Sequence, residues 1–218
     1  MKLQDLILFS SFLISSSSCS SNYEKIKSES ELHQVYISED KNLLYKPYPQ
    51  SEIDRVLCIA EKDYSSVVRE LKTPFEAGIY CTKFLKHGGD NADFIIYGKE
   101  NYWASFKIIH KNKVDDCDGG AVAAAAILSD DWFPPYILVM SDKEKGHAVF
   151  LYQNQKGKYG SIGINNEDIN PPIIDSLEEL VRKIGKNIGM KDDINYEVYD
   201  LGSLHPDFID NDLDNCPE

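Results

Sequence analysis

The sequence predicts a single α+β domain in which several helices precede an antiparallel sheet. Three observations predict this class. Apolar residues recur at helical spacing between positions 53 and 85, eight consecutive apolar residues run from Ala121 to Leu128, and three short β-rich segments lie between positions 136 and 164. Helices followed by closely spaced strands are typical of α+β folds rather than of alternating β-α units. A chain of 218 residues provides one domain with tails, not two full-sized domains.

The composition excludes several classes of protein. Apolar residues make up 42% of the chain, which is enough to fill a sizeable core. Thirty-six acidic side chains against 23 basic ones give a formal charge of −13. This charge repels phosphate backbones and anionic lipid headgroups, so we expect no nucleic-acid partner.

The N-terminus has the pattern of an export signal. Lys2 precedes a short apolar stretch, and the small residues Ser15 to Ser18 precede Cys19. The stretch is too short to span a bilayer, and this arrangement is typical of a secretory signal peptide over residues 1–18. A cysteine directly after small residues is also the acylation point of bacterial lipoproteins, although Ser16 stands where such signals usually carry leucine. We therefore expect an exported protein, secreted or held in the cell envelope by a lipid on Cys19, with no other membrane contact.

The remaining chain divides into a tether, a domain and a tail. Residues 19–46 are rich in Ser, Glu, Lys and Asn without a periodic apolar pattern, which predicts a tether. Residues 47–202 then form the domain, and residues 203–218 form a solvated acidic tail. The aspartates of this tail resemble a calcium loop in charge only, because they lack the glycine and the final glutamate of an EF-hand.

The first half of the domain reads as helices. Apolar spacings of 3 and 4 over residues 51–72 predict two helices, or one broken near Asp63. Thr73 and Pro74 predict the start of a further helix of about 13 residues, which ends at Gly88. Residues 94–97 form a short apolar run, and a helix is plausible over residues 102–110.

The second half contains a buried helix and the sheet. A helix over residues 121–128 would be apolar on every side and therefore buried. Residues 136–140, 147–152 and 159–164 suit strands, and the short turns between them make neighbouring strands antiparallel. Ser176 with Glu179 predicts a capping box that opens an amphipathic helix. A last strand is expected over residues 196–201.

One group of residues can carry chemistry. Cys117 lies at the start of the buried helix, where unpaired backbone N–H groups and the helix dipole lower the pKa of a thiol. His147 opens the second strand and can act as the base for such a nucleophile. A polar group normally fixes the tautomer of this histidine. Asn165, Asn166 and Asp168 follow the third strand, and Asn165 is favoured because it directly follows the β-rich run.

At these residues the sequence resembles the transglutaminase-like and bacterial transglutaminase-like cysteine proteinases of the papain-like superfamily. Trp103 precedes the motif Asp116-Cys117-Asp118 by a short helix, and Gly146-His147-Ala148 starts a strand 30 residues after the cysteine (147 − 117). The resemblance covers about residues 70–190. It implies a papain-like or transglutaminase-like core with Cys117 and His147 as catalytic residues. The third catalytic residue is usually aspartate, whereas Asn165 or Asn166 is expected here. Gly119 and Gly120 replace bulkier residues, which predicts a wider cleft.

The predicted function is an exported or lipid-anchored cysteine hydrolase or acyltransferase that acts on amide bonds of a protein or peptide. The catalytic set is Cys117, His147 and Asn165, with no cofactor and no metal ion. Two alternatives to this function remain open. The first is a non-catalytic binding or structural module with the same fold. The second is a peptidoglycan endopeptidase of the NlpC/P60 type. The latter group usually has Ser-Gly after its cysteine and a more distant histidine.

The other cysteines and histidines carry weaker expectations. Cys58 with Cys81 is the obvious candidate for a disulfide in an exported protein, but the sequence does not fix the pairing among them and Cys216. Four histidines share no context with the site and are expected at the surface: His33, His87, His110 and His205.

Overall fold

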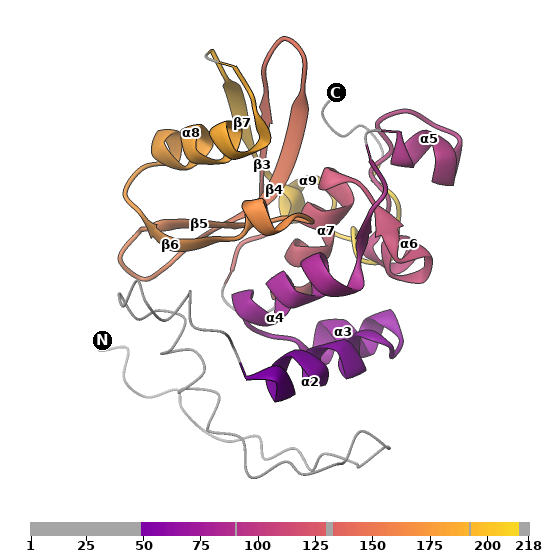
Figure 1. Ribbon diagram of the computed structural model, residues 1–218. Coiled ribbons are helices and arrows are strands. Elements are labelled where there is room, and N and C mark those ends of the chain that lie inside the picture. The colour runs from indigo at the N-terminus through magenta and orange to yellow at the C-terminus, as the bar shows by residue number, and fades with distance from the viewer. Residues whose placement is uncertain (1–48, 90, 130–132, 192, 214–218) are drawn as a thin grey trace.

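The structure is a computed structural model that describes residues 49–89, 91–129, 133–191 and 193–213. The signal peptide expected over 1–18, Cys19, the tether to residue 46 and Cys216 lie outside the described residues. The described chain has helices and one five-stranded antiparallel sheet with strand order β6-β5-β4-β3-β7, so it belongs to the predicted α+β class (Figure 1).

The elements have the following bounds. The helices are α2 (Gln50–Ala60), α3 (Tyr64–Glu70), α4 (Pro74–Ile79), the π-helix η1 (Tyr80–Phe84), α5 (Ala92–Tyr97), α6 (Phe106–Asn112), α7 (Cys117–Leu128), the 3₁₀ turn η2 (Asn166–Asp168), α8 (Leu177–Ile188) and α9 (Leu201–Leu204). The strands are β1 (Lys86–His87), β2 (Val114–Asp115), β3 (Tyr136–Ser141), β4 (Gly146–Gln153), β5 (Tyr159–Ile162), β6 (Asn170–Ile174) and β7 (Asn195–Asp200).

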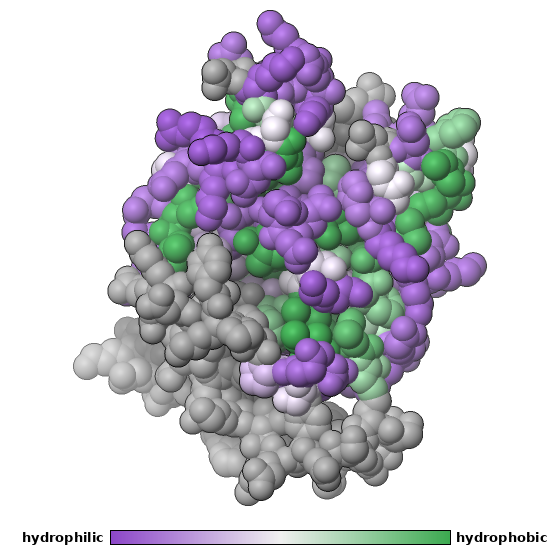
Figure 2. Space-filling model, in the orientation of Figure 1, coloured by the Kyte–Doolittle hydropathy of each residue, from purple (hydrophilic) through white to green (hydrophobic). Residues whose placement is uncertain are grey.

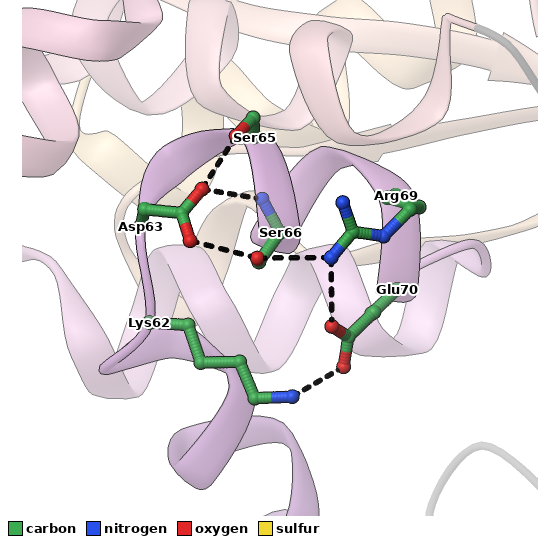
Figure 3. Close-up of polar contacts among 6 residues, drawn as sticks. All are labelled: Lys62, Asp63, Ser65, Ser66, Arg69 and Glu70. Carbon is green, nitrogen blue, oxygen red and sulfur yellow. Dashed lines mark hydrogen bonds and ion pairs between the residues drawn. The ribbon is translucent and has the colours of Figure 1, made fainter. Parts of the chain in front are cut away.

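The N-terminal helices break where the sequence predicts. Asp63 caps α3, since its carboxylate accepts a hydrogen bond of 3.0 Å from the Ser66 N–H (Figure 3). Arg69 and Lys62 then both contact Glu70, which ties the α2–α3 corner to the last turn of α3 (Figure 3). The helix predicted after Thr73 also forms, as α4 continued by η1, and begins with a capping box between Thr73 and Glu76.

Helix α7 lies at the centre of the molecule. The predicted buried helix is confirmed, because every residue from Ala121 to Leu128 is fully buried. One face of the sheet packs on α7 through residues such as Phe150, and the opposite face packs on α8 through residues such as Val149. Alternating side chains of β4 thus fill two cores, and the sheet lies between the N-terminal helices and α8 (Figure 1).

Antiparallel pairing of β3 with β4 and of β4 with β5 is confirmed, as are the helix after Ser176 and the last strand. Strand β6 was not predicted, because Pro171 and Pro172 argue against a strand. Its position at the edge of the sheet explains how the prolines are accommodated. Helix α6 begins at Phe106 rather than at residue 102.

The expectation of a solvated tail from residue 203 is confirmed only in part. Six residues between 203 and 213 are exposed, among them Asp207 and Asp210, but other residues anchor the segment to the core. Phe208 and Leu213 are buried in the core, and the Asp212 carboxylate accepts hydrogen bonds from the Tyr102 hydroxyl and the Ser105 N–H. Buried apolar side chains between the aspartates account for the difference. Within the described residues, no helix has the length and the apolar character that crossing a bilayer requires.

Candidate active site

His147 and Asp168 form a buried pair beside the start of α7. His147 lies at the beginning of β4, and Asp168 ends η2 on the far side of β5. The Nε2–H of His147 donates a hydrogen bond of 2.7 Å to the Asp168 carboxylate, which is fully buried. Because Nε2 carries the proton of this bond, Nδ1 of the neutral ring is an acceptor. The pair therefore holds the tautomer in which Nδ1 can take a proton.

The partner of His147 differs from the predicted one, since the sequence pattern favours Asn165 and the structure places Asp168 against the ring. Asn165 contributes its backbone instead, and its N–H donates to the second oxygen of Asp168 at 3.1 Å. The Ser161 hydroxyl donates to the Asp168 carbonyl at 2.7 Å, which fixes the backbone of η2. The 3₁₀ turn explains the correction, because it turns the chain back by three residues and gives the orienting position to Asp168. Asn166 is exposed.

Cys117 is the first residue of α7, as predicted, and Asp116 is the N-cap. The thiol of Cys117 lies within hydrogen-bonding reach of the backbone N–H of Ala148, the residue that follows His147. No hydrogen bond joins the thiol to the imidazole within the described chain, and Nδ1 of His147 has no protein partner there.

The ionisation of Cys117 is opposite to the expectation from its helix position. Burial, followed by the charges of Asp118 and Asp116, raises the pKa of the Cys117 thiol well above its usual value. A thiol in this environment is protonated at neutral pH, and it needs a base to become a nucleophile.

Three glycines allow the close packing that brings the site together. A Cβ atom on Gly120 would lie 2.7 Å from the Cβ of Ile164, and one on Gly163 would lie 2.7 Å from the Cβ of Asp168. A Cβ on Gly119 would meet the carboxyl group of Asp115 at 2.2 Å. Neighbouring residues thus fill the space beside Gly119 and Gly120. The prediction that these glycines widen a cleft is therefore wrong.

Four carboxylates gather at the start of α7, where Asp116 and Asp118 flank Cys117 in the chain. Asp93, Asp115, Asp116 and Asp118 each place one oxygen within 4.8 Å of the others. Burial raises the pKa of Asp93 to about 6 and that of Asp115 to about 7, and it raises the pKa of Asp118 well above its usual value. Like charges at this spacing repel by about 4 kcal/mol per pair at an effective dielectric constant near 20.

This carboxylate cluster could hold a divalent cation. Asp93 and Asp118 are 4% and 7% exposed, and each has one buried oxygen without a hydrogen-bond partner among the described residues. Buried acceptors in a ring of carboxylates are the ligands that hard cations such as Ca²⁺ and Mg²⁺ take. The sequence shows Asp115, Asp116 and Asp118 together. It gives no signal that Asp93 joins them, because only the tertiary packing of α5 brings this residue to the cluster.

The remaining cysteines and histidines also correct two expectations. Cys58 is disulfide-bonded, but its partner is not Cys81, which is a free thiol buried beside the Gly120 carbonyl. His110 is buried rather than exposed, and both its ring nitrogens have partners. His87 lies at the surface as expected, whereas His205 is partly buried.

Neither a protein-family model nor a curated protein matches this chain.

Proposed function

We propose that the protein is an exported cysteine hydrolase or acyltransferase with a transglutaminase-like, papain-like core, and that it acts on amide bonds of proteins or peptides. The observation that carries the proposal is the buried His147–Asp168 pair together with Cys117, whose thiol lies within hydrogen-bonding reach of the N–H of Ala148, the residue after His147. This arrangement contains a nucleophile, a base with an acceptor nitrogen and a carboxylate that orients the base.

The proposed reaction proceeds through an acyl-enzyme. Nδ1 of His147 takes the thiol proton as the sulfur of Cys117 attacks the amide carbonyl, and an S–C bond forms. His147 returns the proton to the leaving nitrogen as the C–N bond breaks. Water gives hydrolysis in the second half, and an amine gives transfer of the acyl group. In this proposal backbone N–H groups near Cys117 would hold the oxyanion.

Asp168 supports the resemblance to transglutaminase-like cysteine proteinases. The third catalytic residue of that group is usually an aspartate, and the pairing of Asp168 with His147 supplies one. The order of a cysteine on a buried helix followed by a histidine on an antiparallel strand also fits the resemblance. The raised pKa of Cys117 favours the rival interpretation, a binding module with an idle triad.

The test compares wild type with Cys117→Ala and with Cys81→Ala. Iodoacetamide at pH 7.5 should alkylate Cys117 of the wild type much faster than the buried Cys81, as followed by peptide mass spectrometry. Cys117→Ala should lose hydrolysis of unfolded protein substrates completely and keep the circular dichroism of the wild type. Cys81→Ala should keep the activity. Slow alkylation of Cys117 together with absent hydrolysis would identify the binding module.

The compartment is part of the same proposal. The pattern before Cys19 supports export, and the composition of residues 19–46 supports a tether to a lipid. Labelled palmitate should enter the wild type but not Cys19→Ser. Incorporation into neither protein, together with a mature N-terminus elsewhere, would identify simple secretion. Peptidoglycan cleavage by the purified protein would favour the NlpC/P60 type.

A further inference from the structure

The turn that carries Asp168 is closed at its base by a buried polar pair. Ser161 on β5 and Asn170 on β6 face each other across the antiparallel register, and the Asn170 Nδ2–H donates to the Ser161 Oγ at 2.9 Å. On the face shown in Figure 2, hydrophilic side chains gather at the surface over α8 and the β3–β4 hairpin, whereas Ser161 and Asn170 are buried. A hydroxyl and an amide in the core cost free energy unless they are hydrogen-bonded.

The pair passes its hydrogen bonds on to the main chain of Asp168. The Ser161 hydroxyl has one proton, which it donates to the Asp168 carbonyl at 2.7 Å. Its oxygen is then an acceptor, and the amide of Asn170 supplies the donor. The same amide nitrogen lies 3.4 Å from the Asp168 carbonyl and 3.5 Å from that of Glu167. Amide, hydroxyl and carbonyl form a hydrogen-bonded chain, the Asn170–Ser161 relay, which ends on the residue that holds His147.

The relay completes the set of partners around Asp168. The N–H of Asp168 donates to the Asn165 carbonyl at 3.1 Å, and its Oδ2 accepts from the Asn165 N–H at 3.1 Å. Its Oδ1 accepts from the His147 ring at 2.7 Å. The carbonyl is the remaining polar group, and Ser161 is its closer donor. Because the bonds of a buried network support one another, loss of the Ser161 contact loosens the hold of the carboxylate on the ring.

We propose that Ser161 and Asn170 are positioning residues, which fix η2 so that the Asp168 carboxylate holds His147 in the orientation with Nδ1 open. Both residues act through Asp168, not on the reacting atoms. An orienting group must be rigid to be useful, and the relay provides this rigidity at the end of a short turn. The expected effect on catalysis rests on the proposed function, whereas the effect on the His147 ring does not.

Asn154 provides a comparison in the same part of the sheet. Its Nδ2–H donates to the Pro172 carbonyl on β6 at 2.8 Å, and its Oδ1 accepts from the N–H groups of Lys156 and Lys158. This asparagine also ties β6 to a neighbouring turn, but through Pro172 rather than through η2. Its replacement should loosen the sheet edge without acting on His147, which makes Asn154→Ala the matched control.

The test measures how firmly the ring of each buried histidine is held. In the full chain with isotope-labelled histidine, NMR gives the rate at which the Nε2–H of His147 exchanges with water, and the signal is assigned by its loss in His147→Gln. The Nε2–H of His110, which is bonded to the Lys62 carbonyl, serves as the internal reference. Exchange of a buried N–H follows the opening of its surroundings. The variants are Ser161→Ala, Asn170→Ala, the conservative Ser161→Thr and the control Asn154→Ala.

The exchange rate at His147 should rise about two- to tenfold in Ser161→Ala, as the loss of one hydrogen bond implies, and less in Asn170→Ala. Ser161→Thr keeps the hydroxyl and should keep the wild-type rate, as should Asn154→Ala. The rate at His110 should stay the same in every variant. For amide hydrolysis, kcat should fall by a similar factor in Ser161→Ala while KM is unchanged.

An unchanged rate at His147 in Ser161→Ala, or an equal rise at His147 and His110, would overturn the relay. If Ser161→Ala does not fold, the rates in Asn170→Ala decide by the same criteria. A rise at His147 alone, in a protein whose wild type hydrolyses no amide, would support the relay and remove the proposed function.

Discussion

Two buried histidines of this protein have opposite surroundings. His110 uses both ring nitrogens, since Nε2–H donates to the Lys62 carbonyl and Nδ1 accepts from the Tyr80 hydroxyl, each at 2.8 Å. His147 uses only Nε2, which a carboxylate holds, and its Nδ1 has no protein partner in the described chain. The first ring completes a packed network, whereas the second is oriented and left with an open acceptor.

The same contrast extends to the residues around each ring. The rings of Tyr80, Phe84 and Phe106 pack around His110, and the charges of Lys113, Asp63 and Glu61 act on it from nearby. Near His147 lies the partly buried thiol of Cys117, and Asp93 and Asp118, two carboxylates of the cluster at the start of α7, have unpartnered oxygens. Satisfied polar groups stabilise a core, and unsatisfied ones cost free energy that a bound ligand or substrate can recover. The difference identifies which histidine is the candidate base.

The largest expected effect separates the two histidines by activity. His147→Ala should lower kcat/KM for amide hydrolysis by about a thousandfold or more, because the thiol loses its base. His110→Ala should change kcat/KM little at a temperature where the variant stays folded. Both rates are measured on protein whose circular dichroism matches that of the wild type. Equal losses in the two variants would end the functional contrast between the rings.

The next effect concerns the partner of His147. Asp168→Asn should lower kcat/KM by about a hundredfold, since an amide no longer fixes the tautomer with Nδ1 as acceptor. Asn165→Ala should stay within about threefold of the wild type, because the backbone N–H of residue 165 makes the contact. A damaging Asn165→Ala with a silent Asp168→Asn would return the orienting role to the residue that the sequence favours.

These residues also show how far the sequence leads. Apolar periodicity, capping residues and turn spacing were sufficient to predict α7, the pairing of β3, β4 and β5, and the places of Cys117 and His147, because these signals are local. Asp168 was one of three choices, since the orienting residue depends on a three-residue turn at the end of a strand. Asp93 and the burial of His110 could not be predicted, because tertiary packing alone brings residues 93 and 118, or 80 and 110, together.

A third prediction tests whether the unpartnered carboxylates are a cation site. For an affinity near 10 µM, 1 mM CaCl₂ should stabilise protein treated with EDTA by about 2.7 kcal/mol, which raises Tm by about 5–10 °C. Asp118→Asn and Asp93→Asn should reduce this shift, and the exposed Asp207→Asn should keep it. Scanning calorimetry measures all four proteins, with MgCl₂ as a second ion. An equal shift in the Asp118→Asn variant would place the binding elsewhere.

The smallest effect uses pH to examine the satisfied histidine. Burial lowers the pKa of His110, so the folded protein holds fewer protons than the unfolded chain, whose histidine titrates near pH 6.5. The stability that neutral His110 provides is therefore present above about pH 6.5 and is lost as the pH falls through the lowered folded value. His110→Gln cannot titrate, and it keeps the neighbouring charges of Lys113, Asp63 and Glu61.

At pH 8 the wild type should exceed this variant in unfolding free energy by about 1–2 kcal/mol, for the hydrogen bonds lost. Urea titrations at pH 8 and pH 5 should show that this gap narrows at the lower pH, by at most about 1.4 kcal/mol per pH unit. A gap that widens toward pH 5 would mean that the folded protein stabilises protonated His110, and its network would then not be the neutral one that distinguishes it from His147.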